Sequence, residues 1–254
     1  MSSTASLTTL AALSLSAVAC GGTETIADSG SSANVADAVE ETLDAGTARM
    51  TLTFEHTRSG GFGEEIGDRD IIEGVVDFDE HRIEVTTDVE GFVLDEMAFY
   101  LREEGDTEWR RYARDPGPGD EIFPDVSLGR LDPIPVLEYV ASIESSFVVG
   151  ADEDLDGVAT TRYSGQGVAE GLMRALLPDS LYEKLPWETH SASVQHSDVV
   201  PCDVWVGDDG LVRQLVLDFP DFSSFVGDLT TLELSDFGAD VDIEIPEATE
   251  AVEG

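Results

Sequence analysis

The chain has 254 residues, of which 54 are acidic and 13 are basic, and its formal net charge is −41 at pH 7. This charge repels nucleic acid phosphates and anionic lipid headgroups, so we expect no nucleic acid partner and only hydrophobic or covalent membrane attachment. An apolar content of 41% is enough for a sizeable core and excludes a globally disordered chain. The two cysteines, Cys20 and Cys202, stand in no metal-ligand or redox spacing, and we expect no disulfide between them.

The N-terminal apolar run Leu7–Val18 has the length of a signal-peptide core and is too short to span a bilayer. It leads into Ala17-Val-Ala-Cys20-Gly-Gly, which resembles the lipobox of bacterial lipoproteins, where the cysteine is acylated and becomes the new N-terminus. We therefore predict a signal peptide over 1–19, a lipidated Cys20 and a flexible tether over 20–33. Met1–Ser6 contains no Lys or Arg, a departure that is also consistent with a start upstream. The alternatives are a secretory signal cleaved near Ala19 and an accidental apolar N-terminus.

The next part of the chain predicts one helix followed by a series of strands. Asn34 caps a helix over Val35–Ala45, and Gly46 follows it as a C-terminal glycine. Met50, Leu52 and Phe54 then alternate with polar residues, as in a strand. Four further strands are predicted at Asp70–Phe78, Arg82–Val89, Phe92–Leu101 and Glu108–Tyr112. The short turns between them favour an antiparallel meander over βαβ units.

The second half of the chain predicts two more helices and the remaining strands. Asp132-Pro133 has the form of an N-cap with proline at the first helical position, opening a helix through about Ile143. A second helix is predicted over Val168–Leu177, with a short continuation through Leu185. The other predicted segments are a hairpin of Phe147–Gly150 with Val158–Gly165, a last strand at Leu229–Leu234, an alternating stretch at Val241–Ile245, and an acidic tail over 247–254. The expected plan is a single domain over residues 34–246.

The strongest local signal is a hairpin over Asp203–Asp218, with Asp209-Gly210 as its turn. This turn predicts Val206 opposite Arg213 and Val204 opposite Leu215. Trp205, Val212 and Val216 would share the other face, so both faces are substantially apolar. Two interpretations remain open: a central strand pair covered on both sides, or a sheet whose second face lines an apolar cavity.

No pattern in the sequence predicts catalysis. The four histidines stand at no metal-binding spacing, and no G-x-S-x-G elbow occurs. Asp152–Asp156 lacks the twelve-residue pattern of a calcium loop. Cys202 is followed by Asp203, so we expect its thiol to have a raised pKa and to be a poor nucleophile. We therefore expect a protein that is not an enzyme and has no metal or cofactor.

Three stretches in chain order, together with the lipobox, resemble the LppX/LprG-type (LppX–LprAFG) family of actinobacterial lipoproteins. They are Ala45-Gly-Thr-Ala-Arg-Met-Thr51, Asp203-Val-Trp-Val-Gly-Asp-Asp-Gly-Leu-Val-Arg213, and Glu233-Leu-Ser-Asp-Phe-Gly-Ala-Asp-Val241 followed by Pro246. The resemblance implies a LolA/LolB-like α+β fold, in which a strongly curved antiparallel half-barrel carries about three helices across its hollow face. It also implies that the space between sheet and helices binds acyl chains, and it supplies no catalytic residues.

These expectations describe a monomeric lipoprotein, anchored at the outer face of the cell membrane, that carries or presents lipids or glycolipids. The lining residues predicted from the second half are Leu172, Met173 and Leu176 on a helix and Trp205 on the sheet. Ordinary core packing is the alternative role for each of them. The alternative function is an envelope sensor or protein-interaction module on the same scaffold, as in RseB-type regulators, with a filled interior and a protein partner.

Overall fold

The computed structural model describes residues 31–55, 69–86, 91–102, 105–114, 131–143, 147–177, 199–218 and 229–250. The predicted signal peptide, Cys20, most of the tether and the continuation through Leu185 lie outside these ranges. The helices are α1 (Ser31–Leu43), α2 (Pro133–Ala141) and α3 (Ala169–Leu176). The strands are β1 (Thr47–Glu55), β2 (Arg69–Asp77), β3 (Arg82–Thr86), β4 (Gly91–Leu94), β5 (Ala98–Arg102), β6 (Trp109–Ala113), β7 (Val148–Leu155), β8 (Val158–Val168), β9 (Val199–Gly207), β10 (Val212–Asp218), β11 (Leu229–Ser235) and β12 (Ala248–Glu250).

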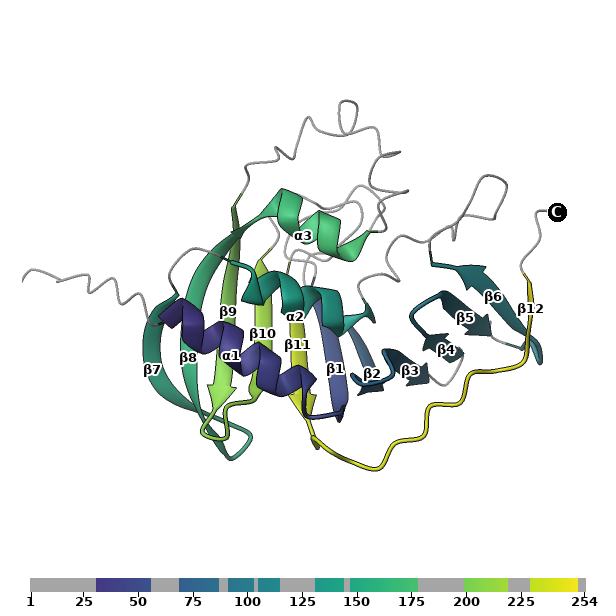
Figure 1. Cartoon of the computed structure of the whole chain (residues 1–254), viewed down its shortest axis with the longest axis horizontal. Coiled ribbons are helices and arrows are strands. Elements are labelled where there is room, and N and C mark those ends of the chain that lie inside the picture. Colours follow the sequence, from purple (N-terminus) through teal and green to yellow (C-terminus); the bar gives the residue numbers. More distant parts are fainter. Residues whose placement is uncertain are drawn as a thin grey trace, which may run out of the picture.

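All twelve strands belong to one sheet, in the order β12-β6-β5-β4-β3-β2-β1-β11-β10-β9-β8-β7. Every neighbouring pair is antiparallel except β12 and β6, which run parallel. The sheet is curved and unclosed, and the three helices lie across one of its faces (Figure 1). The predicted α+β class, a curved antiparallel half-barrel with helices over its hollow side, is confirmed.

Eleven of the strands form two meanders, β1–β6 and β7–β11, which meet where β1 pairs with β11, and β12 is added beside β6. Side chains alternate between the helix-covered face and the opposite face, which we call the outer face. On β1, for example, Met50, Leu52 and Phe54 are buried in the main core, whereas Arg49 on the outer face is exposed. The main core therefore lies between the sheet and the helices.

Across β1–β6, the helix-covered face carries a continuous line of buried apolar residues in register, which we call the apolar row. Its members are Ala48, Val76, Ile83, Leu94, Phe99 and Tyr112. Each is directly opposite the next on the neighbouring strand, and all belong to the main core. Cross-strand pairs of this kind stabilise a sheet and leave a smooth apolar surface.

Helix α1 is held on the sheet by an apolar stripe and by one buried hydroxyl. Val35, Ala38 and Val39 are buried in the main core, at the spacing expected for one side of a helix. Thr42 is fully buried; its Oγ1 donates to the carbonyl oxygen of Ala38 (2.6 Å) and accepts from the backbone N–H of Val212 (2.8 Å). This contact joins the helix to the start of β10.

The β9–β10 hairpin follows the predicted register only in part. Val204 lies opposite Leu215 as expected, but Val206 lies opposite Val212 and not Arg213. A bulge between residues 212 and 214 causes the difference: it places Val212 in the main core, where it is fully buried. The hydroxyl of Thr42 on α1 accepts a hydrogen bond from the Val212 N–H at this bulge, and this contact stabilises the changed register.

Two other predicted strands have different bounds. The expected strand Phe92–Leu101 is two strands, β4 and β5, because Asp95 Oδ1 accepts from the backbone N–H groups of Met97 and Ala98 and forms a tight turn. Strand β7 extends through the expected acidic turn as far as Leu155. Charged side chains are common on such sheet edges because they discourage further pairing.

The C-terminal segment 239–247, which we call the strap, crosses the outer face of the first meander. Ile243 is buried there against Val93, Ala98 and Tyr100, in a second apolar cluster separate from the main core. The strap ends in β12, which pairs beside β6 at the sheet edge (Figure 1). Residues 248–250 of the expected acidic tail thus form a strand, whereas the expected alternation at Val241–Ile245 forms no strand.

Candidate functional site

The predicted lining residues on α3 lie at the junction of α3, α2 and β8. Leu172 and Met173 are buried in the main core, and Leu176 is partly buried against it. Helix α3 follows directly from β8, and its apolar residues lie mainly on one side. Glu170 and Arg174 form an ion pair on its exposed side. The three predicted residues therefore lie together on the side of α3 that packs against the main core.

Tyr139 of α2 connects the helices to the end of β8. Its hydroxyl donates to the carbonyl oxygen of Val168 (3.0 Å), and burial raises its pKa to about 12, with the nearby Cys202 as a smaller cause. Gly167 and Gly171 leave the space that its ring occupies: a Cβ added at Gly167 would lie 1.9 Å from the Tyr139 hydroxyl oxygen. The sequence contained no signal for this contact, since it joins residues from three elements.

Cys202 lies on β9, on the helix-covered face, and is buried in the main core. Burial raises the pKa of its thiol to about 12, and the carboxylate of Asp203 adds to the shift. This agrees with the expectation of a thiol that is protonated at neutral pH and poorly nucleophilic.

Trp205 does not share a face with the helix residues. It follows Val204, which faces the helices, and therefore points to the outer face. There its indole Nε1 donates to Glu153 Oε2 (2.8 Å), and the Arg162 guanidinium stacks 5.1 Å from the centre of its ring. Arg162 also donates to Asp203 Oδ2 (2.7 Å), which raises the pKa of the guanidinium. The structure thus separates Trp205 from Leu172, Met173 and Leu176.

The N-terminus of α2 is fixed by a buried carboxylate close to the apolar row. Asp132, fully buried, caps the helix as predicted, with Oδ1 accepting from the Ile134 N–H (3.0 Å). Its Oδ2 lies 3.0 Å from Nε2 of His81 and 2.5 Å from Nη2 of Arg114. The turn between β2 and β3, the end of β6 and the start of α2 are therefore held at one point, and Leu131 and Ile134 pack into the main core beside it.

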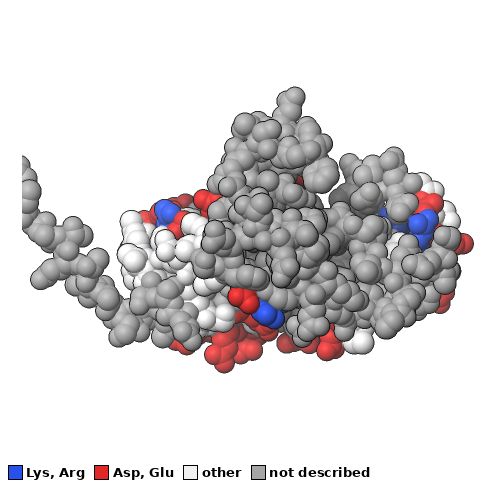
Figure 2. Space-filling model, turned by 90° about the horizontal axis from the view of Figure 1, so that it is seen from above, with Lys and Arg blue, Asp and Glu red and all other residues white. Residues whose placement is uncertain are grey.

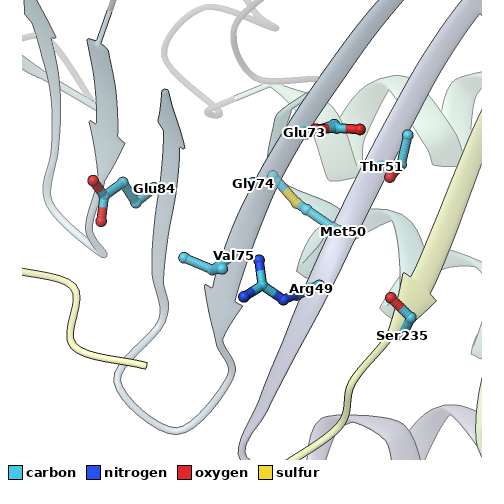
Figure 3. A pocket seen from close by; sticks show the side chains of 8 residues that line it. All are labelled: Arg49, Met50, Thr51, Glu73, Gly74, Val75, Glu84 and Ser235. Atoms are coloured by element: carbon cyan, nitrogen blue, oxygen red, sulfur yellow. The ribbon is translucent and has the colours of Figure 1, made fainter. Parts of the chain in front are cut away.

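A pocket of about 440 Å³ opens on the outer face between β11, β1, β2 and β3 (Figure 3). Its lining residues are Arg49, Met50, Thr51, Glu73, Gly74, Val75, Glu84 and Ser235. Two carboxylates and a guanidinium contribute to this lining, so the pocket is not the apolar cavity that the sequence resemblance implies between sheet and helices.

Within the ranges that the structure describes, no three His, Cys, Asp or Glu side chains lie together in an arrangement that could hold a metal ion. None of the helices in the same ranges has the length and apolar character that crossing a bilayer requires.

The apolar row is the feature that sequence reasoning missed. In Figure 1 the helices lie over β1 and the second meander, whereas β3–β6 extend to the side of α2 without a described helix over them. The row continues past the helices through Ile83, Leu94, Phe99 and Tyr112, and the side chains of all four are buried in the main core. Strand alternation assigns each residue a face, but only the register of six strands shows that these side chains form one line.

No protein-family model matches the chain, and no curated protein is similar to it in sequence. Among solved structures, LprF from Mycobacterium bovis is similar with a TM-score of 0.48 and 15% identity, covering 85% of this chain and 96% of LprF. A LolA superfamily protein from Nitrosomonas europaea is similar with a TM-score of 0.30 and 8% identity, covering 84% of this chain and 94% of that protein.

Proposed function

We propose that this protein is a cell-envelope lipoprotein, anchored through Cys20, that binds lipid acyl chains on the helix-covered face of its sheet. The observation that carries the proposal is the apolar row, which extends across β1–β6 and beyond the helices. The lipobox-like sequence at Cys20 supports the anchor, and the three motif stretches support the lipid-binding role by resemblance.

The row has the length and chemistry that an acyl chain requires. Six strands at about 4.8 Å spacing span roughly 24 Å between the first and the last, which is comparable to an extended fatty acyl chain. Each methylene transferred from water to such a surface contributes about 0.8 kcal/mol, so ten methylenes contribute about 8 kcal/mol before ordering costs. We therefore expect a dissociation constant no tighter than about 1 μM for a single chain.

Cross-linking with a diazirine-bearing fatty acid tests the site. We expect labelled peptides from β3–β6 that contain residues of the helix-covered face, and competition by an unlabelled fatty acid. Leu101→Asp should weaken uptake of a fluorescent fatty acid because Leu101 is partly buried against the main core, whereas Thr51→Asp, on the outer face, should not. Labelling confined to the outer face, or an equal effect of both substitutions, would contradict the proposal.

The anchor has a separate test. Cys20→Ser should release the protein from the membrane fraction to the medium, because the remaining acidic domain is repelled by anionic headgroups. Retention of this variant on membranes in high salt would contradict the anchor, whatever the result of the fatty-acid experiment.

A second function, a surface sensor or protein-interaction module, is favoured by two observations. Leu172 and Met173 are packed within a continuous core, and the described pocket lies on the charged outer face. In this alternative the interior holds no cargo, and a protein partner binds the domain. Native mass spectrometry of gently purified protein distinguishes the two functions: co-purifying lipid supports the carrier, and protein that stays empty when offered fatty acid supports the sensor.

A further inference from the structure

Exposed apolar side chains gather at one end of the second meander. Val148, Val149, Val168 and Val199 are 68%, 50%, 49% and 45% exposed, and they make up four of the seven large exposed apolar residues in the described ranges. Val168 lies directly opposite Val199, and Val148 lies opposite Ser164, four residues earlier on β8. We call this group the valine end; it lies where β7 and β9 begin and where β8 ends.

The valine end itself carries little charge for a strongly acidic protein, and the ion pair of Arg162 with Asp203 (2.7 Å) borders it, because Asp203 lies opposite Ser164. Residues 147–151, 165–171 and 199–202 contain one charged residue, Glu170, and its carboxylate is paired with Arg174 at 3.2 Å. In the whole chain, by contrast, 54 of 254 residues are acidic. Figure 2 shows the described residues on the β7 side of the molecule as a mostly uncharged area. An exposed apolar patch in such a context indicates a surface that contacts another apolar body.

The position of the first described residues indicates which apolar surface the valine end contacts. Helix α1 starts on the side of the molecule where β7 forms the sheet edge (Figure 1). Only ten residues, 21–30, separate Cys20 from Ser31, and a fully extended chain of that length reaches about 35 Å. A lipid anchor on Cys20 would therefore keep this side of the domain within reach of the bilayer.

We propose that the valine end rests on the neutral lipid surface of the membrane to which the protein is anchored. This inference rests on the lipidation of Cys20 in the proposed function. The contact is aliphatic and includes no basic residue, so it needs uncharged lipid and not anionic headgroups. With this end on the bilayer, the acidic remainder of the domain points away from it.

The test uses the full-length lipidated protein on phosphatidylcholine vesicles, with an environment-sensitive fluorophore on single introduced cysteines. Val148→Cys and Val168→Cys report on the valine end. Val158→Cys is the matched control, because Val158 lies at the other end of β8 and is 36% exposed. The native Cys202 is 2% exposed and should stay unlabelled. Vesicles containing lipid with a doxyl quencher near the headgroup measure contact.

We expect the fluorophores at positions 148 and 168 to shift to shorter wavelength and to be quenched more strongly than the fluorophore at 158. Adding Val199→Asp should reverse the effect at 168. Probes that remain aqueous on anchored protein, or that respond regardless of Val199→Asp, would overturn the inference. A response that appears without vesicles and grows with protein concentration would also overturn it, because a second copy would then cover the valine end. Release of the protein from the vesicles would instead show that the anchor itself is absent.

Discussion

The buried carboxylate of Asp132 provides a sharp test of how the helix layer is attached to the sheet. Asp132→Asn keeps a side-chain oxygen that can cap α2 but removes the negative charge beside Arg114 and His81. Hydrogen bonds to charged groups contribute about 1.5–3 kcal/mol, so we expect the Asn variant to lose about 2 kcal/mol of unfolding free energy. Asp132→Ala also removes the cap, which is worth about 1 kcal/mol, and should lose about 3 kcal/mol in total.

Urea unfolding at matched salt measures both losses, read from the transition midpoint with an unchanged slope. The control is the exposed pair Arg49–Asp236, whose side chains are 64% and 66% exposed and whose separation is 3.2 Å. Arg49→Ala should cost no more than about 1 kcal/mol, and added salt should reduce that cost further. The reasoning is refuted if Asp132→Asn is as stable as the parent protein, or if its effect is no larger than that of the exposed pair.

Three further predictions concern contacts described above. Gly167→Ala should cost about 1–3 kcal/mol, because the new Cβ would meet the Tyr139 ring; an unchanged melting temperature would contradict this. Thr42→Val should cost about 1–3 kcal/mol by leaving the Val212 N–H without its acceptor, whereas Thr42→Ser should be nearly neutral in urea unfolding. The thiol of Cys202 has a pKa of 9.0 in the unfolded chain, and burial raises this pKa to about 12 in the folded protein. Its contribution to stability is therefore present below pH 9 and is lost as pH rises toward 12, because the unfolded chain loses the proton first. Stability measured from pH 8 to 11 should therefore fall less steeply in Cys202→Ala.

Local signals predicted the elements whose causes are local. Asp132-Pro133 predicted the start of α2, and Asp209-Gly210 predicted the hairpin, because a cap and a tight turn depend on neighbouring residues. The bulge beside Val212 was not predictable, because its stabilising hydroxyl on Thr42 is 170 residues away in sequence. The split between β4 and β5 did have a local signal, the carboxylate of Asp95, but the apolar residues on both sides suggested one uninterrupted strand.

The candidate site was harder to predict than the fold. Helical spacing assigned Leu172 and Met173 to the apolar side of their helix, and both are buried in α3, because the helical period determines which residues share a face. Trp205 was assigned to the same lining without knowledge of which face of β9 the helices cover. The apolar row depends on strand register across β1–β6, which no single stretch of sequence specifies.

The position of the last strand has a consequence for how the protein matures. Strand β1 obtains its second neighbour only when β11 arrives, and the free side of β6 is closed only by β12, the last strand in the described residues. A chain emerging N-terminus first would therefore hold its first meander with both edges unpaired until β11 and β12 had emerged. Unpaired edges invite pairing with other chains, so the arrival of β11 and β12 is also the point at which the first meander is protected from aggregation.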